Sequence, residues 1–154
     1  MKNILNRIFA ALAAVTALAA VSCSKVNPAD EANNFLDVNP SNLHGNWQLV
    51  TVNGAALEEG TYCYINFNRS GYEYKLWETL TSIPAAPNVD EGTFQIYTDP
   101  ELGAYIRGID SVKEDWSDLY VIKELTKDSM IWVGVKDPDF IQTFIKVSKV
   151  PFAN

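Results

Sequence analysis

A cysteine stands directly after a long apolar run near the N-terminus. Lys2 and Arg7 give the start of the chain a positive charge with no acid beside them, and Ile8–Val21 is almost entirely apolar. A charged start followed by an apolar stretch is typical of a secretory signal peptide. The apolar run has about fourteen residues, fewer than the roughly twenty of a membrane-spanning helix. We therefore predict that residues 1–22 are a cleaved signal peptide, which leaves the thiol of Cys23 as a candidate for covalent modification.

The residues that lead into this cysteine, Ala20, Val21 and Ser22, are small. The arrangement resembles the lipobox of bacterial lipoproteins, whose cysteine is lipidated through its sulfur and becomes the first residue of the mature chain. The resemblance implies that Cys23 carries a diacylglyceryl group that palmitate would label, and several acyl chains hold a protein stably on a membrane. It predicts a lipoprotein anchored in the bacterial outer membrane, on either its periplasmic or its cell-surface face. The alternative is an ordinary secretory signal with an incidental cysteine. This sequence departs from the family pattern at Ala20, where the family more often has leucine.

The charge of the chain limits its partners. The full sequence has 12 basic and 19 acidic residues, and loss of Lys2 and Arg7 with the signal peptide would leave a net charge of about −9. A strongly acidic protein does not attract nucleic acid or an anionic membrane surface through general electrostatics. We therefore expect no nucleic-acid partner. The 132 residues after the predicted signal peptide are enough for one domain with one hydrophobic core.

Cys63 is the second of the two cysteines. If Cys23 is lipidated, no intramolecular disulfide can form, and an unpaired cysteine is then either a reactive thiol or a small buried hydrophobe. Cys63 alternates with Ile65 and Phe67 along a predicted strand. This shared face favours the buried position.

The chain changes character after its first forty residues. Residues 24–42 are rich in Asn, Asp, Ser, Pro and Ala without a sustained periodicity, which predicts a flexible tether that follows Cys23. Short β-rich runs then alternate with turn residues, so we predict one domain over residues 43–154. The expected strands are Gly45–Val52, Thr61–Phe67, Tyr72–Leu80, Gly92–Thr98, Ala104–Asp110, Asp118–Leu125, Ser129–Val135 and Phe140–Ser148, with a turn or short helix within Val112–Leu119. Eight sequential strands with short connections favour a small antiparallel up-and-down barrel, because closure removes exposed edges. A β-sandwich is the alternative.

The first predicted strand carries a recognisable motif. Leu43-His44-Gly45-Asn46-Trp47 is followed by Gln48-Leu49-Val50-Thr51-Val52-Asn53-Gly54, and its Gly-x-Trp element resembles the opening strand of lipocalins and of short lipocalin-like domains in bacterial lipoproteins. The later segment Tyr120–Trp132 resembles the strand, Leu-Thr turn and strand of the same family. The resemblance implies that Trp47 closes one end of a compact barrel. A barrel of eight strands is either filled by its side chains or has space for one small ligand.

Residue types that commonly catalyse reactions or bind metals are few. His44 is the only histidine, so a triad or a histidine-rich metal site has a single candidate base. Acidic pairs occur at Glu58-Glu59, Asp90-Glu91, Glu114-Asp115 and Asp137-Pro138-Asp139. Each pair lies in a predicted turn and none has the spacing of a calcium loop. We therefore predict a protein without enzymatic activity, metal or cofactor.

Two sets of residues are candidates for binding. In the first, Trp47, Tyr105 and Arg107 surround the mouth of the barrel and hold a small hydrophobic or amphipathic ligand. Tyr105 and Arg107 share one face of their strand, so an inward guanidinium would bind a carboxylate or phosphate, whereas an outward one would be ordinary surface.

The second set is an exposed aromatic surface on a filled barrel. It consists of Tyr62, Tyr64, Tyr72 and Tyr74, and it would recognise an envelope protein or a glycan. Tyrosine is also common in strands for packing reasons alone. The two hypotheses differ in where these rings point, because the second requires a contiguous exposed patch.

Overall fold

The computed structural model describes residues 35–80, 87–111, 115–151 and 153. The predicted signal peptide, the lipidation site Cys23 and the first part of the tether lie outside these residues. Within them, no helix combines the length and the apolar character needed to cross a membrane.

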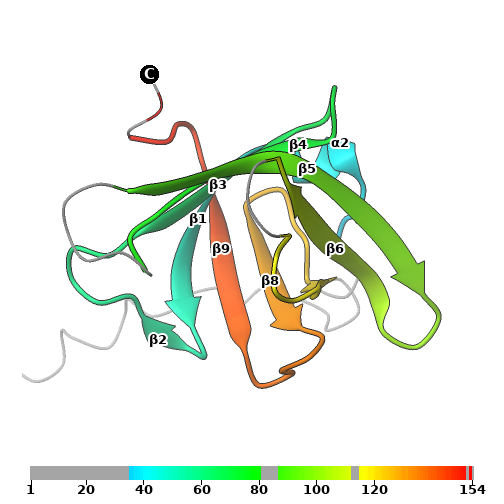
Figure 1. Ribbon diagram of the computed structural model, residues 1–154. Coiled ribbons are helices and arrows are strands. Elements are labelled where there is room, and N and C mark those ends of the chain that lie inside the picture. Colours follow the sequence, from blue (N-terminus) through cyan, green and yellow to red (C-terminus); the bar gives the residue numbers. More distant parts are fainter. Residues whose placement is uncertain (1–34, 81–86, 112–114, 152, 154) are drawn as a thin grey trace, which may run out of the picture. The chain divides into compact units, whose positions relative to one another are not determined.

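The described chain folds into one antiparallel sheet that closes on itself (Figure 1). Its strands are β1 (Gly45–Val52), β2 (Ala55–Ala56), β3 (Cys63–Asn68), β4 (Glu73–Glu78), β5 (Asn88–Asp99), β6 (Gly103–Asp110), β7 (Tyr120–Lys123), β8 (Ser129–Gly134) and β9 (Ile141–Val147). Strand β1 pairs with β3, each of β3 to β8 pairs with the next strand along the chain, and β9 pairs back with β1. The result is an eight-stranded barrel, with β2 as a short extra strand on β1. The predicted up-and-down barrel is confirmed and the sandwich is excluded.

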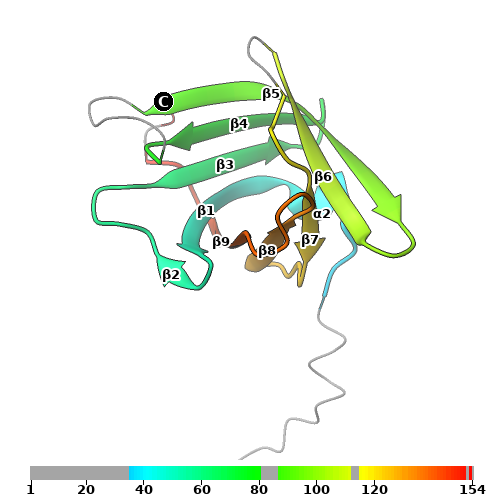
Figure 2. The same ribbon diagram turned by 60° about the horizontal axis from the view of Figure 1, so that its bottom comes forward.

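The pairing is uneven around the barrel. The β5–β6 hairpin is the longest, with eight paired positions from Gly92↔Asp110 to Asp99↔Gly103, and its tip extends beyond the other strands (Figures 1 and 2). Strands β6 and β7 pair at only two positions, Tyr105↔Val121 and Ile106↔Tyr120. The closing pair β1–β9 has six positions, interrupted by an irregularity between Leu49 and Thr51.

All eight predicted strands are present, with shifts at their ends. Strand β5 begins at Asn88, four residues before the predicted start, and β7 is shorter than predicted. Residues 115–119 contain no helix, and the rest of the predicted turn or helix there lies largely outside the described residues. Two elements were not predicted, the two-residue strand β2 and the short helix α2 (Pro40–Leu43).

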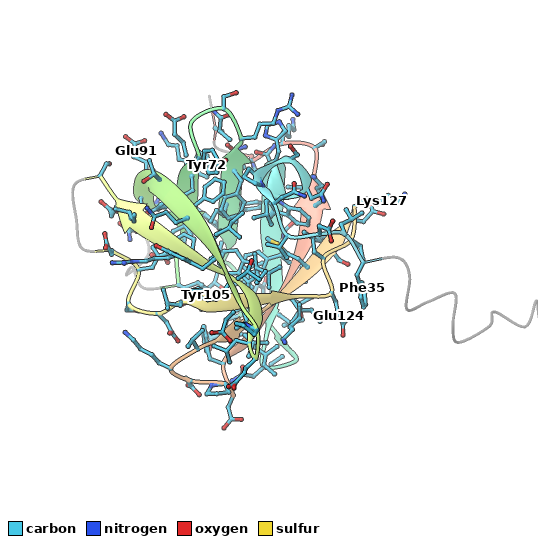
Figure 3. All side chains as sticks on the ribbon, turned by 90° about the vertical axis from the view of Figure 1, so that its right-hand side faces the viewer. Phe35, Tyr72, Glu91, Tyr105, Glu124 and Lys127 are labelled. Carbon is cyan, nitrogen blue, oxygen red and sulfur yellow. The ribbon has the colours of Figure 1, made fainter. Side chains whose placement is uncertain are left out.

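The interior is apolar and follows the alternation of the strands. On β3, Cys63, Ile65 and Phe67 all point inward, so Cys63 is a free thiol buried as predicted. The other strands contribute Trp47, Leu49, Tyr74, Phe94, Ile106, Ile122, Met130, Trp132 and Phe144. Side chains crowd the space that the strands enclose (Figure 3).

The structure shows which faces of β6 and β8 point into the barrel. On β8 the buried residues are Met130 and Trp132, whereas Ile131 and Val133 are only half-buried on the other face. On β6 the buried side is that of Ile106 and Gly108. Both strands carry large apolar residues on both faces, so their alternation alone does not show which face is inside.

Residues 35–42, which the sequence assigned to the tether, pack with the barrel. Residues 35–42 belong to the same compact unit as the barrel rather than to a flexible segment that reaches residue 42. The backbone N–H of Leu36 donates to the carbonyl of Leu125 at 2.7 Å. Asn39 caps α2, since its side-chain oxygen accepts from the N–H groups of Ser41 and Asn42 at 3.0 Å each. The local docking of Phe35–Val38 thus places the fold boundary near residue 35.

Candidate functional site

Trp47 closes one end of the barrel. Its side chain is fully buried, and its indole Nε1–H donates to the carbonyl oxygen of Leu43 at 2.8 Å. The ammonium nitrogen of Lys146 lies 4.8 Å from the centre of the indole ring, within the range of a cation–π interaction. Burial lowers the pKa of Lys146, which fits a side chain laid over the ring. Trp47 therefore has a structural role and is not accessible to a ligand.

The backbone conformation and the close packing at the closed end explain why a glycine stands in the Gly-x-Trp element. Gly45 has a φ of 121°, a backbone conformation that other residues rarely adopt. A Cβ atom at this position would also lie 2.9 Å from Cε of Lys146. Glycine lets the lysine stem pass close to the backbone on its way to Trp47.

Tyr105 and Arg107 lie on the outer face of β6 and do not join Trp47. Tyr105 stacks on Tyr97 of the neighbouring strand, with ring centres 5.2 Å apart. Arg107 forms an ion pair with Asp115 at 2.5 Å, and the two side chains are 42% and 36% exposed. The predicted convergence of these residues with Trp47 around a barrel mouth is wrong, because β6 turns Ile106 and Gly108 inward instead. The outward reading of Arg107 is the one that the structure supports.

The four tyrosines of the alternative hypothesis do not form one exposed patch. Tyr64 is 9% exposed and packs in a small outer cluster with Trp77 and Val150, joined by Tyr62. Tyr74 is 2% exposed and points into the barrel, while Tyr72 is 52% exposed. A single recognition surface cannot be built from side chains that lie on opposite faces of the sheet. The exposed aromatic surface predicted from these residues is therefore not present.

The end of the barrel opposite Trp47 contains a cavity of about 290 Å³. It lies where β3, β5, β7 and β9 begin and where β4, β6 and β8 end. Its lining consists of Cys63, Ile65, Leu76, Asp90, Asp110, Asp115, Trp116, Ser117, Tyr120, Trp132, Gln142 and Phe144. We call this the open-end cavity. Apolar walls with a few polar groups are typical of small-molecule sites, and the volume is close to the lower limit of their usual range.

Aromatic side chains form one side of the open-end cavity. Trp116 comes from the connection between β6 and β7, and its backbone N–H donates to the carbonyl of Gly108 at 3.2 Å. The indole lies against Gly108 so closely that a Cβ there would be 2.1 Å from its ring. Ring centres of Trp116 are 5.6 Å from Trp132 and 6.1 Å from Tyr120, and Trp132 is 4.7 Å from Phe144. Glycine at position 108 thus makes room for a tryptophan inside the barrel.

Acidic groups gather on another side. Asp90 and Asp110 occupy inward positions of β5 and β6, and Asp115 precedes Trp116. Tyr74 lies near these aspartates. Burial raises the pKa of Tyr74 to about 12, and the charges of the three aspartates add to this rise, whereas the Trp116 indole opposes it. Burial also raises the pKa of the Cys63 thiol to about 12, with a smaller contribution from Glu78, so this thiol is neutral and unreactive.

Two larger hollows lie outside the barrel. One, of about 490 Å³, covers the polar outer face of β3 to β5 and includes Asn66, Lys75 and Glu91. The other, of about 580 Å³, lies between α2 and β5 and includes Val38, Tyr72 and Tyr97. Each includes interior residues, Tyr74 in the first and Phe94 and Ile96 in the second, whereas the open-end cavity is lined mainly from the interior and combines aromatic walls with converging polar groups. We therefore take the smaller hollow as the candidate site.

The other residues considered for catalysis or metal binding are His44 and the acidic side chains. Nδ1 of His44 donates to the carbonyl oxygen of Phe67 at 2.9 Å, next to the C-terminus of α2. Over the parts of the chain that the structure describes, no three acidic, histidine or cysteine side chains are close enough together to hold a metal ion.

A closed eight-stranded antiparallel barrel, sealed at one end by a tryptophan of its first strand and hollow at the other, defines a small-ligand binding scaffold of the lipocalin type. The family model of the lipocalin-like domain matches residues 43–132, and the chain belongs to this family. Proteins of this family are in general non-enzymatic binding proteins. No curated protein and no solved structure matches the chain significantly. The closing strand β9 lies beyond the matched segment, although the barrel is incomplete without it.

Sequence analysis missed the residues that form the open-end cavity. Asp90 was assigned to a turn, but it lies in β5, where it shares the inward phase with Phe94 and Ile96. Extending that alternation backwards from Phe94 is the signal that finds it. No local signal identifies Trp116, because its position depends on contact with Gly108 of another element.

Proposed function

We propose that this protein is a lipoprotein of the bacterial outer membrane whose barrel binds one small amphipathic ligand in the open-end cavity. The observation that carries the proposal is the cavity itself. It has aromatic and aliphatic walls, polar groups on one side and access from the end of the barrel opposite Trp47. Membership of the lipocalin-like family supports a binding role.

The membrane anchor is the second part of the proposal. Its support is the resemblance of residues 20–23 to a lipobox and the apolar run before them. Cells expressing the full chain should incorporate radiolabelled palmitate into the protein, and Cys23→Ala should abolish both the label and recovery in the membrane fraction. Unchanged labelling of Cys23→Ala would refute the anchor. Protease treatment of intact cells distinguishes the cell-surface face from the periplasmic face.

The binding role is tested by filling the cavity. Leu76 lines the open-end cavity from β4, so Leu76→Trp should occupy the space that a ligand needs. Val89, on the neighbouring strand, is exposed on the outer face and gives the matched control Val89→Trp. Native mass spectrometry of the full chain purified from its host should show a small molecule that remains in the control and is lost in Leu76→Trp. A protein that carries no small molecule and binds no added amphipathic probe would contradict the proposed role.

A further inference from the structure

The open-end cavity is charged on one side. Three of its lining residues, Asp90, Asp110 and Asp115, are acidic, and no described residue that lines it is basic. Arg107 offsets Asp115 from the outer face of β6. Asp90 and Asp110 also interact with neighbouring residues, but they retain their place in the wall. A ligand that enters this space therefore meets a negative potential, since low-dielectric walls concentrate the field of the carboxylates.

The walls next to the carboxylates are aromatic. Trp116, Tyr120 and Trp132 lie with ring centres 5.3 to 6.1 Å from one another. Faces of aromatic rings carry negative charge density and attract organic cations, and tryptophan does so most strongly. The same rings offer a large apolar surface to the rest of a ligand. Carboxylates and ring faces therefore favour the same sign of charge.

A buried hydroxyl lies beside the same groups. Tyr74 is 2% exposed, and its phenolic oxygen makes no hydrogen bond of normal geometry with the residues that the structure describes, although the neighbouring Trp116 indole lowers its pKa. Its ring packs edge-on against Trp116, with centres 4.9 Å apart. The charges of Asp90, Asp110 and Asp115 act on the pKa of this phenol, so Tyr74 lies near these carboxylates although it is not itself one of the residues that line the cavity. A buried polar group without a partner is unfavourable, and its oxygen can accept a hydrogen bond from an N–H donor.

We infer that the ligand of the open-end cavity is an organic amine, a protonated ammonium group attached to a small aromatic or aliphatic body. The ammonium group lies on the side of the cavity that carries Asp90, Asp110 and Asp115, and the body packs against Trp116 and Trp132. This inference rests on the proposed binding function and adds the chemical class of the ligand to it.

Two other ligand classes fit these observations less well. An anion would face three carboxylates, and the guanidinium of Arg107 points outward and is paired with Asp115. A bare metal ion needs several oxygen ligands at short range. In the described part of the chain no group of three suitable side chains is close enough to provide them.

Three probes that share a phenyl ring and a two-carbon linker test the inference. They are 2-phenylethylamine, 2-phenylethanol and 3-phenylpropanoate, which carry a positive, a neutral and a negative group at neutral pH. Binding to the full chain in detergent is measured by calorimetry and by tryptophan fluorescence. We expect the amine to bind at least about tenfold more tightly than the alcohol, and the acid more weakly than either.

Charge variants identify the groups responsible. Asp90→Asn and Asp110→Asn should each reduce the affinity for the amine several-fold and leave the affinity for the alcohol unchanged. Glu101→Gln removes the same charge from the exposed turn at the far end of the β5–β6 hairpin and serves as the control. Circular dichroism of each variant verifies that it is folded. Should either aspartate variant fail to fold, Arg107→Gln provides the opposite test, because it makes the rim more negative and should strengthen binding of the amine.

The outcomes separate this inference from the function on which it rests. Equal or tighter binding of the alcohol would overturn the amine inference and leave a small-ligand binding protein. Displacement of the amine by an equal concentration of Ca²⁺ would also overturn it, in favour of a metal site. No binding of any probe, together with no small molecule retained from the host, would contradict both.

Discussion

The two ends of the barrel are built on different principles. At the closed end, Trp47 is fully buried, makes a hydrogen bond to Leu43 and lies under the Lys146 ammonium group. At the open end, the corresponding large ring, Trp116, is half-buried and borders a cavity with three aspartates in its wall. Both ends use an indole next to a glycine. The tryptophan of the closed end is fully buried with its indole N–H hydrogen-bonded, whereas that of the open end borders a cavity, so we assign stability to the closed end and binding to the open one.

The largest expected effect is at the closed end. Trp47→Ala removes a fully buried ring and a buried hydrogen bond, and we expect it to lower the free energy of unfolding by about 3–5 kcal/mol. Trp116→Ala should cost clearly less, because its ring is only half-buried. Urea denaturation of both variants measures the difference. Equal losses would show that the two ends contribute alike and would contradict the division of roles.

The next effect tests how tightly the open end is packed. Gly108→Ala places a methyl group where the indole of Trp116 lies, so the indole must move. We expect a loss of about 1–3 kcal/mol, as for other overpacked sites, together with a red shift of tryptophan fluorescence as Trp116 becomes more exposed. Gly71→Ala is the control, since its new methyl would meet only the flexible side chain of Glu73. An unshifted spectrum in Gly108→Ala would mean that the ring does not occupy this position in solution.

A third prediction tests whether water reaches the Cys63 thiol in the wall of the open-end cavity. Burial raises the pKa of the Cys63 thiol from 9.0 to about 12. The unfolded chain therefore releases this proton first, so the contribution of the neutral thiol is complete below pH 9 and is lost as pH rises toward 12. Above pH 9 the stability of the wild type should fall more steeply than that of Cys63→Ala, by up to about 1.4 kcal/mol per pH unit. Urea midpoints between pH 8 and 10 measure the two slopes. Parallel slopes would indicate that water reaches the thiol.

The smallest expected effect is on the rim. The Arg107–Asp115 ion pair is substantially exposed, and exposed pairs contribute about 0–1 kcal/mol. Arg107→Gln should therefore change stability by less than about 1 kcal/mol, with a difference that decreases at high salt. Thermal unfolding at low and high salt measures it. A larger loss would show that the rim is part of the structural core rather than of the binding end.

The structure of the closed end could be predicted from the sequence, whereas the open-end cavity could not. The Gly-x-Trp motif is local, because the φ of Gly45 and the indole of Trp47 lie two residues apart. The eight strands were also predictable, since turn residues separate short apolar runs. The open-end cavity instead depends on contacts between distant segments, such as Trp116 on Gly108. The sequence also does not show which face of β6 and of β8 points into the barrel, because large apolar residues such as Tyr105 and Ile131 lie on the outer faces as well.

The pairing of β1 with β9 has a consequence for how the chain folds during synthesis. Gln48 pairs with Ile145, so the first strand obtains its last partner only when almost the whole domain has been made. Bringing such distant segments together is slow compared with forming hairpins between neighbours. Until then, both β1 and β8 present unpaired edges that can join other chains. For the exported lipoprotein that we propose, this interval is when a chaperone that covers strand edges would be of most use.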